Sequence, residues 1–282
     1  MRTRFAPTPS GYLHEGNAVN AVLTSWLARQ VGADVALRID DVDAARCRPE
    51  FVEDIFAVLE WLGVPWALGP RTAADFNDHH SQRARTERYR VELDAAMVAG
   101  LRVYACRCSR AESARMGRRG CVADCIDADH SLVKGETALR ARLPDVAEDP
   151  VVWRRDGLPA YHLVSVIEDR QLGTTHIVRG LDLLDSTRLQ AALGTYLGMD
   201  FARVDVRHHS LVQGPDGAKL SKSQLSDGPL ERSEAARQRV FRLAGTMAAS
   251  VAIDEPGVPT VTAAARNDTT HPVTGIAAPP LH

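Results

Sequence analysis

The sequence predicts an α/β protein in which a doubly wound parallel sheet carries a small inserted module and a short helical extension. Apolar segments of strand and helix type alternate from the N-terminus, which is the pattern of a parallel sheet with helices on both faces. The alternation breaks at about residue 101, where four of the five cysteines gather, and it resumes near residue 159. These three observations define the predicted architecture.

The first two strands are each followed by a polar segment and a helix. Residues 3–6 are typical of a strand that ends at Pro7, and a helical spacing of apolar residues follows the next loop. A second strand, residues 35–39, ends in an acidic cluster at Asp40, and the next helix begins at Pro49. Ligands of doubly wound sheets bind beyond the C-terminal ends of the strands. We therefore expect the loop after Pro7 and the cluster at Asp40 to form one ligand site.

The rest of the chain divides into an insertion, a second α/β half and an extension. Short segments joined by polar connections predict an inserted module within residues 101–156. Beyond the module we expect two strands, a helix, a third strand and a final helix, at residues 161–167, 175–178, 186–197, 204–206 and 231–250. The tail after Asp254 is rich in Pro, Thr, Ala and Gly and is expected to be mobile. The predicted domains are the first catalytic half, the cysteine-containing module, the second catalytic half, and the extension with its tail, at residues 1–100, 101–158, 159–223 and 224–282.

Composition sets wide limits. With 282 residues, 45% of them hydrophobic, the chain can bury one core and a small added module. A net charge of −2 gives no general attraction to nucleic acid, so composition is silent about RNA. No apolar run approaches the roughly 20 residues of a membrane-spanning helix, and the N-terminal segment lacks the apolar core of a signal peptide. We expect a cytoplasmic monomer without a membrane partner.

Two separated motifs indicate binding of a polyphosphate. The first lies where a helix begins, so that free N–H groups and the helix dipole suit a phosphate, and it contains His14, Gly16 and Asn17. The second is a Gly- and Ser-rich loop whose lysines can neutralise charge on a departing pyrophosphate, and it contains Lys219, Ser221 and Lys222. A glycine-rich loop with a histidine is more often a plain turn, and a lysine pair is more often a solvated surface. Either motif alone is therefore weak.

Taken together, the two motifs resemble the ATP-binding motifs of class I aminoacyl-tRNA synthetases, His-x-Gly-His/Asn and Lys-Met/Leu-Ser-Lys-Ser. Residues 4–16 are also similar to the opening of glutamyl-tRNA synthetases, and residues 37–43 are similar to their acidic segment. The likeness continues through residues 167–187 and 215–222 and covers about residues 2–223 in all. It implies a Rossmann-type catalytic domain and a two-step ligase.

Where the family continues into a large anticodon-binding domain, this sequence has only a short extension. The nearest resemblance is therefore to a truncated paralog that attaches glutamate to the queuosine base of tRNA(Asp). The segment Arg154-Arg155-Asp156-Gly157-Leu158-x-Ala160-Tyr161 is similar to that paralog and favours it. The resemblance implies tRNA as a partner, and it implies that ordinary tRNA(Glu) is not charged.

The resemblance also assigns site residues. ATP contacts are expected from Pro7, His14, Gly16, Asn17, Lys219, Ser221 and Lys222, with catalytic roles for His14, Asn17, Lys219 and Lys222. The amino-acid pocket is expected from Arg4, Ala6, Thr8, Asp40, Tyr161 and Arg179. Mg²⁺ is expected to accompany ATP. Asp40 stands where the family has a Glu, and the shorter acid leaves the exact amino acid open between glutamate and a close analogue.

The clustered cysteines predict a metal site. Cys106-x-Cys108 and Cys121-x3-Cys125 offer four thiolates, enough for a closed tetrahedral Zn²⁺ with a structural role. The paralog has a Tyr as its third ligand, and Cys121 takes that position here. The alternative is four buried or free thiols.

We expect the protein to activate glutamate, or a close analogue, as an adenylate and to transfer it to an acceptor, which the resemblance identifies as queuosine in tRNA(Asp). A second hypothesis keeps activation but changes the acceptor to a carrier protein, a small amine or another RNA. A third hypothesis is a non-catalytic RNA-binding module. It is disfavoured because a binding relic has no chemical need for both His14 and Lys222.

Overall fold

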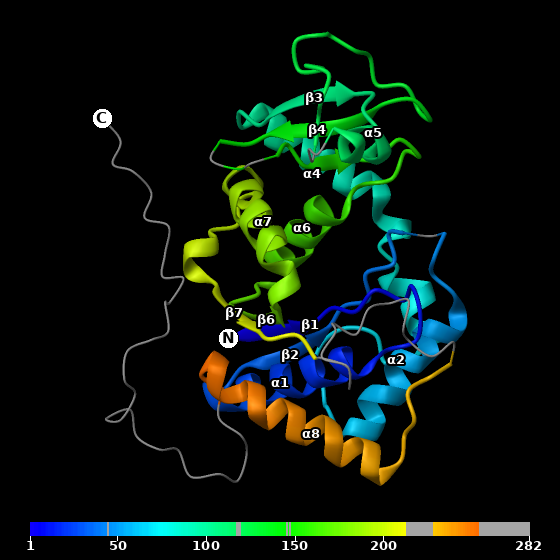
Figure 1. Cartoon of the computed structure of the whole chain (residues 1–282), viewed down its shortest axis with the longest axis vertical. Helices are drawn as coiled ribbons and strands as arrows, with labels where there is room; N and C mark the ends of the chain where they lie inside the picture. The colour runs from blue at the N-terminus through cyan, green and yellow to red at the C-terminus, as the bar shows by residue number, and fades with distance from the viewer. Residues whose placement is uncertain (44, 117–119, 145, 147, 213–227, 254–282) are drawn as a thin grey trace.

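The computed structural model describes residues 1–43, 45–116, 120–144, 146, 148–212 and 228–253. Its centre is a parallel sheet of four strands in the order β2-β1-β6-β7 (Figure 1). The strands are β1 (Arg2–Phe5), β2 (Asp34–Leu37), β6 (His176–Gly180) and β7 (Asp205–His209). The chain crosses from β2 to β6 only after the inserted module, so the two catalytic halves meet where β1 pairs with β6.

Helices cover both faces of this sheet. The α-helices are α1 (Glu15–Val31), α2 (Pro49–Leu62), α3 (Ala73–Asp75), α4 (Thr86–Val98), α5 (Arg110–Arg115), α6 (Tyr161–Leu172), α7 (Leu184–Leu197) and α8 (Glu234–Ala248). Shorter helical turns are η1 (Phe76–His80), η2 (Arg83–Arg85), η3 (Leu181–Leu183), η4 (Phe201–Arg203) and η5 (Ala249–Val251). Figure 1 places α1, α2 and α8 on one side of the sheet and α6 and α7 on the other. This is the doubly wound arrangement that the sequence predicts.

Two apolar clusters hold the layers together. One joins α1, α2 and α8 to the sheet and includes Leu23, Ile55 and Val240. The other joins α4, α6 and α7 to the inserted strands and includes Tyr89 and Ile167. Burying each large apolar side chain contributes roughly 1.5–3 kcal/mol. The rigid sheet edge between the two clusters is where site residues converge.

The inserted module contains its own antiparallel sheet, β3-β4-β5, with β3 (Arg102–Cys106), β4 (Ala138–Arg142) and β5 (Val151–Trp153). β3 and β4 pair from Arg102 opposite Arg142 to Cys106 opposite Ala138. The change of pattern near residue 101 thus marks a different kind of sheet. The division of the chain at residues 100, 158 and 223 stays a prediction.

The predicted strand at residues 161–167 is wrong, because these residues form the first half of α6. Every residue of α6 from Leu163 to Asp169 is buried, including the polar Ser165, Glu168 and Asp169. A fully buried helix loses the polar stripe that gives a helix its period of 3.6, so periodicity cannot separate it from a buried strand. The helix ends at Gly173, whose φ of 63° is a left-handed conformation that favours glycine.

The other predicted elements are found close to their expected places. The helix expected at residues 186–197 is α7, and the helix expected at 231–250 is α8 with η5. No helix in the described ranges is long and apolar enough to cross a membrane. The tail after Asp254 and the second phosphate motif, with Lys219, Ser221 and Lys222, lie outside the described residues.

Candidate active site

The loop after β1 and the acidic segment after β2 lie side by side at the C-terminal edge of the sheet. The parallel pairing of the two strands continues beyond them, because Arg38 N–H donates to the Phe5 carbonyl at 3.0 Å and Asp40 N–H donates to the Pro7 carbonyl at 2.9 Å. Arg179 reaches the same edge from the end of β6. The convergence predicted from the strand ends is confirmed.

The His-x-Gly loop forms the start of α1. His14 is the N-cap residue, and its N–H donates to Asn17 Oδ1 at 3.1 Å. A Cβ on Gly16 would lie 3.0 Å from Cε1 of the His14 ring, so a larger residue here would have to displace the imidazole slightly. Asp54 on α2 accepts from Leu13 N–H at 2.8 Å. These contacts hold His14 beside a helix N-terminus, where an anion is favoured.

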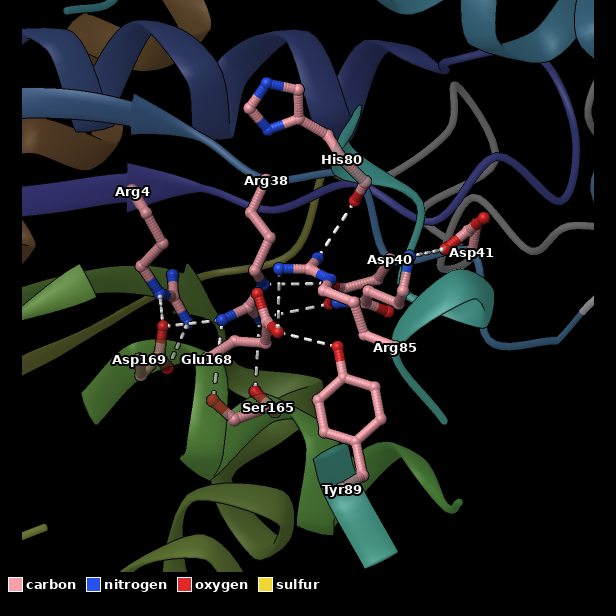
Figure 2. Close-up of polar contacts among 11 residues, drawn as sticks. Arg4, Arg38, Asp40, Asp41, His80, Arg85, Tyr89, Ser165, Glu168 and Asp169 are labelled. Atoms are coloured by element: carbon pink, nitrogen blue, oxygen red, sulfur yellow. Dashed lines mark hydrogen bonds and ion pairs between the residues drawn. The ribbon is translucent and has the colours of Figure 1, made fainter. Parts of the chain in front are cut away.

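A chain of buried charges joins β1, the segment after β2 and α6 (Figure 2). Asp169, which is fully buried, accepts from Arg4 Nε at 2.9 Å and from Arg38 Nη1 at 2.7 Å. Arg38 then reaches Asp40 with Nε and Nη2, at 2.7 and 3.1 Å. Burial alone would raise the pKa of Asp169, but the two guanidinium groups outweigh it and hold the pKa below its usual range. In this closed network two arginines pair with two carboxylates, so the positive and negative charges balance.

Asp40 is therefore already paired. Besides Arg38 it accepts from Gln82 Nε2 at 2.8 Å, and both side chains are buried. The other end of that amide, Gln82 Oε1, is buried and has no hydrogen-bond partner in the described part of the chain. An acceptor left unpaired beside the acidic segment can receive a donor from a ligand.

The neighbouring Asp41 anchors the segment that carries Gln82. It accepts from Ser81 Oγ at 2.6 Å and from Gln82 N–H at 2.8 Å. Burial raises the pKa of Asp41, and these two hydrogen bonds oppose the rise. Further along, Tyr89 donates to Glu168 at 2.6 Å, and Arg85 pairs with the same carboxylate (Figure 2). Glu168 on α6 thus connects α6 to Tyr89 on α4 and to Arg85 on η2.

Arg179 on β6 has a different environment. Its Nη1 donates to Gln190 Oε1 at 2.8 Å and to Thr187 Oγ1 at 3.2 Å, both on α7. Its Nε and Nη2 are buried and have no hydrogen-bond partner among the described residues. Burial, together with the nearby positive charge of Arg4, lowers the pKa of Arg179 to about 10, so it is still charged at neutral pH. A buried cation with two unused donors is ready for an anion.

Two histidines beside Arg179 are neutral. Burial and the charge of Arg179 lower the pKa of His162 to about 4, and they lower that of His208 to about 4 as well. The His208 Nε2 and the Thr187 hydroxyl are 2.8 Å apart. These imidazoles therefore shape the region without adding charge at neutral pH.

The remaining predicted pocket residues lie around this edge with unequal exposure. Tyr161 is the first residue of α6, is 38% exposed, and stacks at a tilt on His162 with ring centroids 5.2 Å apart. Ala6 is half-buried, Pro7 is buried and Thr8 is exposed. The sequence reasoning missed Arg38, Gln82 and Asp169 as site residues, although it quoted the segments that contain Arg38 and Asp169. Arg38 could have been found as a charge that directly follows an apolar strand, whereas no local signal singles out Asp169 within the polar run of residues 168–171.

In the inserted module, the four clustered cysteines come together at the end of β3. The four sulfur atoms all lie within 4.8 Å of one another; they belong to Cys106, Cys108, Cys121 and Cys125. The Cys108 sulfur is 3.8 Å from that of Cys121 and also 3.8 Å from that of Cys125. Burial works to raise the pKa of Cys121, but N–H groups of Ala123 and Cys125 outweigh it and lower the pKa to about 7. The arrangement is four converging thiols, one of them readily ionised.

Parallel strands, a helix N-terminus at the first loop, and buried arginines at the C-terminal ends of the strands are typical of a nucleotide-binding α/β domain. The family model of the tRNA synthetases class I (E and Q), catalytic domain, matches residues 1–119 and 130–242. The chain belongs to this family of ligases. The match includes both phosphate motifs and most of the inserted module.

Several relatives are similar over most of their length. The chain is 38% identical to a glutamyl-Q tRNA(Asp) synthetase of Symbiobacterium thermophilum, with 78% of this chain and 77% of the relative covered. A glutamyl-Q tRNA(Asp) synthetase of Pseudomonas aeruginosa is 36% identical, with 86% and 84% covered. A glutamate–tRNA ligase of Methylobacillus flagellatus is 33% identical, with 79% of this chain but 52% of the ligase covered.

Solved structures agree on the fold. The glutamate-tRNA synthetase of Elizabethkingia anophelis is similar with a TM-score of 0.65 and 25% identity, covering 79% of this chain and 53% of that one. A glutamate tRNA ligase of Elizabethkingia meningosepticum, in complex with its amino acid, gives 0.64 and 26%, covering 79% and 52%. The chain spans about half the length of these ligases.

Proposed function

We propose that the protein uses ATP to activate glutamate as glutamyl-adenylate and transfers the glutamyl group to tRNA, with the queuosine base of tRNA(Asp) as acceptor. The family supports the activation step. The acceptor is supported by the relatives called glutamyl-Q tRNA(Asp) synthetases, which match at 36–38% identity over most of their own length.

The observation that carries the amino-acid assignment is the buried side of the Arg179 guanidinium, where Nε and Nη2 have no hydrogen-bond partner among the described residues. Glutamate differs from most amino acids in its side-chain carboxylate, and a planar guanidinium matches a carboxylate with two parallel hydrogen bonds. Leaving a buried cation without such a partner costs several kcal/mol, so a ligand that supplies one gains affinity. The neighbouring histidines are neutral at pH 7, and the charges of Arg4 and Arg38 are balanced by Asp169 and Asp40. The pocket therefore favours an anionic side chain.

The chemistry follows from placing glutamate at Arg179 and ATP at the His14 loop. An oxygen of the substrate α-carboxylate attacks the α-phosphorus of ATP, and the bond to the bridging oxygen of pyrophosphate breaks. His14 and Asn17 stabilise the charge that spreads over the transferring phosphoryl group. Lys219 and Lys222, assigned by resemblance, neutralise the leaving pyrophosphate, and Ser221 assists in binding it. A bound Mg²⁺ would screen the phosphates of ATP.

The other pocket residues orient the amino acid. Arg4, whose Nε and Nη2 both contact Asp169, adds positive charge beside the carboxylates. Asp40 and Gln82 offer oxygens to the substrate ammonium, while Ala6, Thr8 and Tyr161 line the entrance. Because Asp40 is held by Arg38, its contribution to the ammonium is mainly its negative charge. The amide of Gln82, which is buried beside Asp40, thus compensates for the shorter side chain of Asp40.

We also propose a structural Zn²⁺ in the inserted module. Four thiolates at about 2.3 Å from a tetrahedral ion lie about 3.8 Å from one another. The two Cys108 distances of 3.8 Å agree with that spacing. The N–H groups of Cys108 and Val122 point to the sulfurs of Cys106 and Cys108, as donors to charged thiolates do. Four protein ligands leave no open position, so the ion would hold the module together and take no part in the reaction.

Pyrophosphate exchange with a panel of amino acids, with and without tRNA, tests the proposal. We expect glutamate to support exchange without tRNA. Transfer is then measured with queuosine-containing tRNA(Asp), the same tRNA without queuosine, and tRNA(Glu); only the first should accept glutamate. Exchange with another amino acid would overturn the substrate. Charging of tRNA(Glu), or transfer only to a carrier protein or amine, would overturn the acceptor.

A further inference from the structure

The C-terminal helix α8 lies along α1, the helix that begins at the His-x-Gly loop (Figure 1). Val240 and Ala244 of α8 are buried in the same apolar cluster as α1, and Phe241 contacts Trp26 with ring centroids 6.1 Å apart. This packing fixes α8 and places its polar side chains beside the loop. Two arginines of the extension use that position.

The first arginine pairs with the acid inside the loop. Glu15 lies between His14 and Gly16 and is the first residue of α1. Arg239 reaches it with two nitrogens, Nε at 2.8 Å from Oε1 and Nη2 at 3.0 Å from Oε2. The side chain of Glu15 is only 12% exposed, so its charge faces the protein and Arg239 rather than open water.

The second arginine pairs with the acid beneath the loop. Asp54 on α2 accepts from Leu13 N–H through one oxygen, at 2.8 Å, and from Arg232 Nη1 through the other, at 2.9 Å. The Asp54 side chain is 3% exposed. One carboxylate thus joins the loop to the residues just before α8.

The consequence is electrostatic. Two carboxylates flank a loop assigned to a ligand that itself carries about four negative charges near neutral pH, and each uncompensated carboxylate would repel it. Charges several ångströms apart at a protein surface interact appreciably, and salt screens the interaction. Both carboxylates are met by an arginine from residues 228–253. The extension therefore supplies the positive charge that the loop needs.

We propose that Arg239 and Arg232 are positioning residues that neutralise Glu15 and Asp54, and that the helical extension thereby maintains ATP affinity. This inference rests on the proposed function in one respect, that the His14 loop binds ATP. It gives residues 228–253 a role in the reaction without contact with the reacting atoms.

The test is a charge-removal cycle on Arg239 and Glu15. ATP binding is measured directly by isothermal titration with ATP and Mg²⁺ at low salt, without an amino acid. Arg239→Gln is expected to weaken ATP binding about fivefold, because Glu15 is left uncompensated. The double variant Glu15→Gln with Arg239→Gln is expected to restore binding to within about twofold of the parent. The effect of Arg239→Gln should shrink as salt is raised.

Arg242→Gln is the matched control. Arg242 is exposed on the same helix, and its removal changes the net charge equally. We expect it to leave ATP binding unchanged. Thermal unfolding of every variant shows whether α8 stays packed, and exchange kinetics should show a higher KM for ATP with little change in kcat.

The outcomes separate three cases. Unchanged ATP binding in Arg239→Gln overturns the inference, and so does a double variant as weak as Arg239→Gln, since rescue is then absent and the pair acts only as a clamp. An equal loss in Arg242→Gln also overturns it. If the parent binds ATP and the cycle behaves as expected but no amino acid supports exchange, the proposed function fails while the inference stands.

Discussion

On the β1–β2 side of the sheet edge, Arg4 and Arg38 are met by Asp169 and Asp40, whereas on the β6–β7 side Arg179 keeps two buried donors without a partner among the described residues. The charges of the first side are paired before any ligand arrives, whereas two buried donors of Arg179 have no partner in the described part of the chain. The arginines of both sides are buried to a similar extent, so the two sides differ in the pairing of their charges and not in burial. A closed charge network sets the geometry of a site, while an unpaired buried group indicates what the site receives.

The cysteine cluster is a second region that is arranged to receive a ligand. We expect the largest effect of a single substitution in this cluster. Protein prepared without chelator should contain about one zinc per chain, because four convergent thiolates bind zinc with about 10 kcal/mol or more of free energy. Elemental analysis and thermal unfolding measure this. Cys125→Ser should lose the metal and lower the Tm.

Cys47→Ser is the control for the cysteine variant. Cys47 lies apart from the cluster and its sulfur donates to the Asp43 carbonyl at 3.2 Å. The Cys47→Ser variant should retain zinc and have the same Tm as the parent. Parent protein that contains no zinc, and whose Tm does not fall when a chelator is added, would contradict the assignment.

The next effect concerns Arg179. Arg179→Met should lower glutamate-dependent pyrophosphate exchange by about a hundred- to a thousandfold, roughly 3–4 kcal/mol, because the side-chain carboxylate loses a bidentate partner. Its Tm should change little, since removal of an incompletely paired buried charge offsets the hydrogen bonds that Gln190 and Thr187 lose. Arg188→Met, an exposed substitution on α7, serves as control. Exchange at the parent's rate in Arg179→Met would remove Arg179 from the pocket.

Asp169 should show the reverse pattern. Asp169→Asn leaves Arg4 and Arg38 buried without their shared carboxylate and should lower the free energy of unfolding by about 3 kcal/mol, measured by urea unfolding. Asp185→Asn, an exposed change on α7, should have little effect. If Asp169→Asn were as stable as the parent, the closed network would not hold this edge together.

The pH dependence of stability gives the same residue a second readout. The folded-state pKa of Asp169 is depressed, so the unfolded chain takes up its proton first as the pH falls. The stability that Asp169 contributes is complete above the ordinary carboxyl pKa of about 3.9 and is lost as the pH falls from there through the folded-state pKa. Asp169→Asn should remove this part of the acid sensitivity.

These contrasts show what the sequence could reveal. The strand ends were sufficient to predict that the loop after Pro7 and the acidic segment at Asp40 meet, because the C-terminal ends of parallel strands lie at the same edge; Arg179 was expected there only from the resemblance. The helical state of residues 161–167 was not predictable from periodicity, since burial on every side erases it. The pairing of Asp40 with Gln82 could not be foreseen either, because these two residues are far apart in the sequence and only the fold brings them together. Local spacing predicts which groups gather, and only packing decides which of them are already satisfied.

The smallest expected effect tests Gln82, whose buried Oε1 has no hydrogen-bond partner in the described part of the chain. If Gln82 Oε1 accepts from the substrate ammonium, Gln82→Met should raise the KM for glutamate about three- to tenfold and leave the KM for ATP unchanged, as expected for one hydrogen bond of about 1 kcal/mol. A role limited to holding Asp40 would act on any ligand of the pocket. Glutarate, which lacks the amino group, separates the two roles: as a competitive inhibitor it should bind the parent and Gln82→Met equally, because it has no ammonium bond to lose. If glutarate binding weakens as much as glutamate binding, Gln82 only positions its neighbours, and the closed side of the edge contributes nothing to the substrate beyond the charge of Asp40.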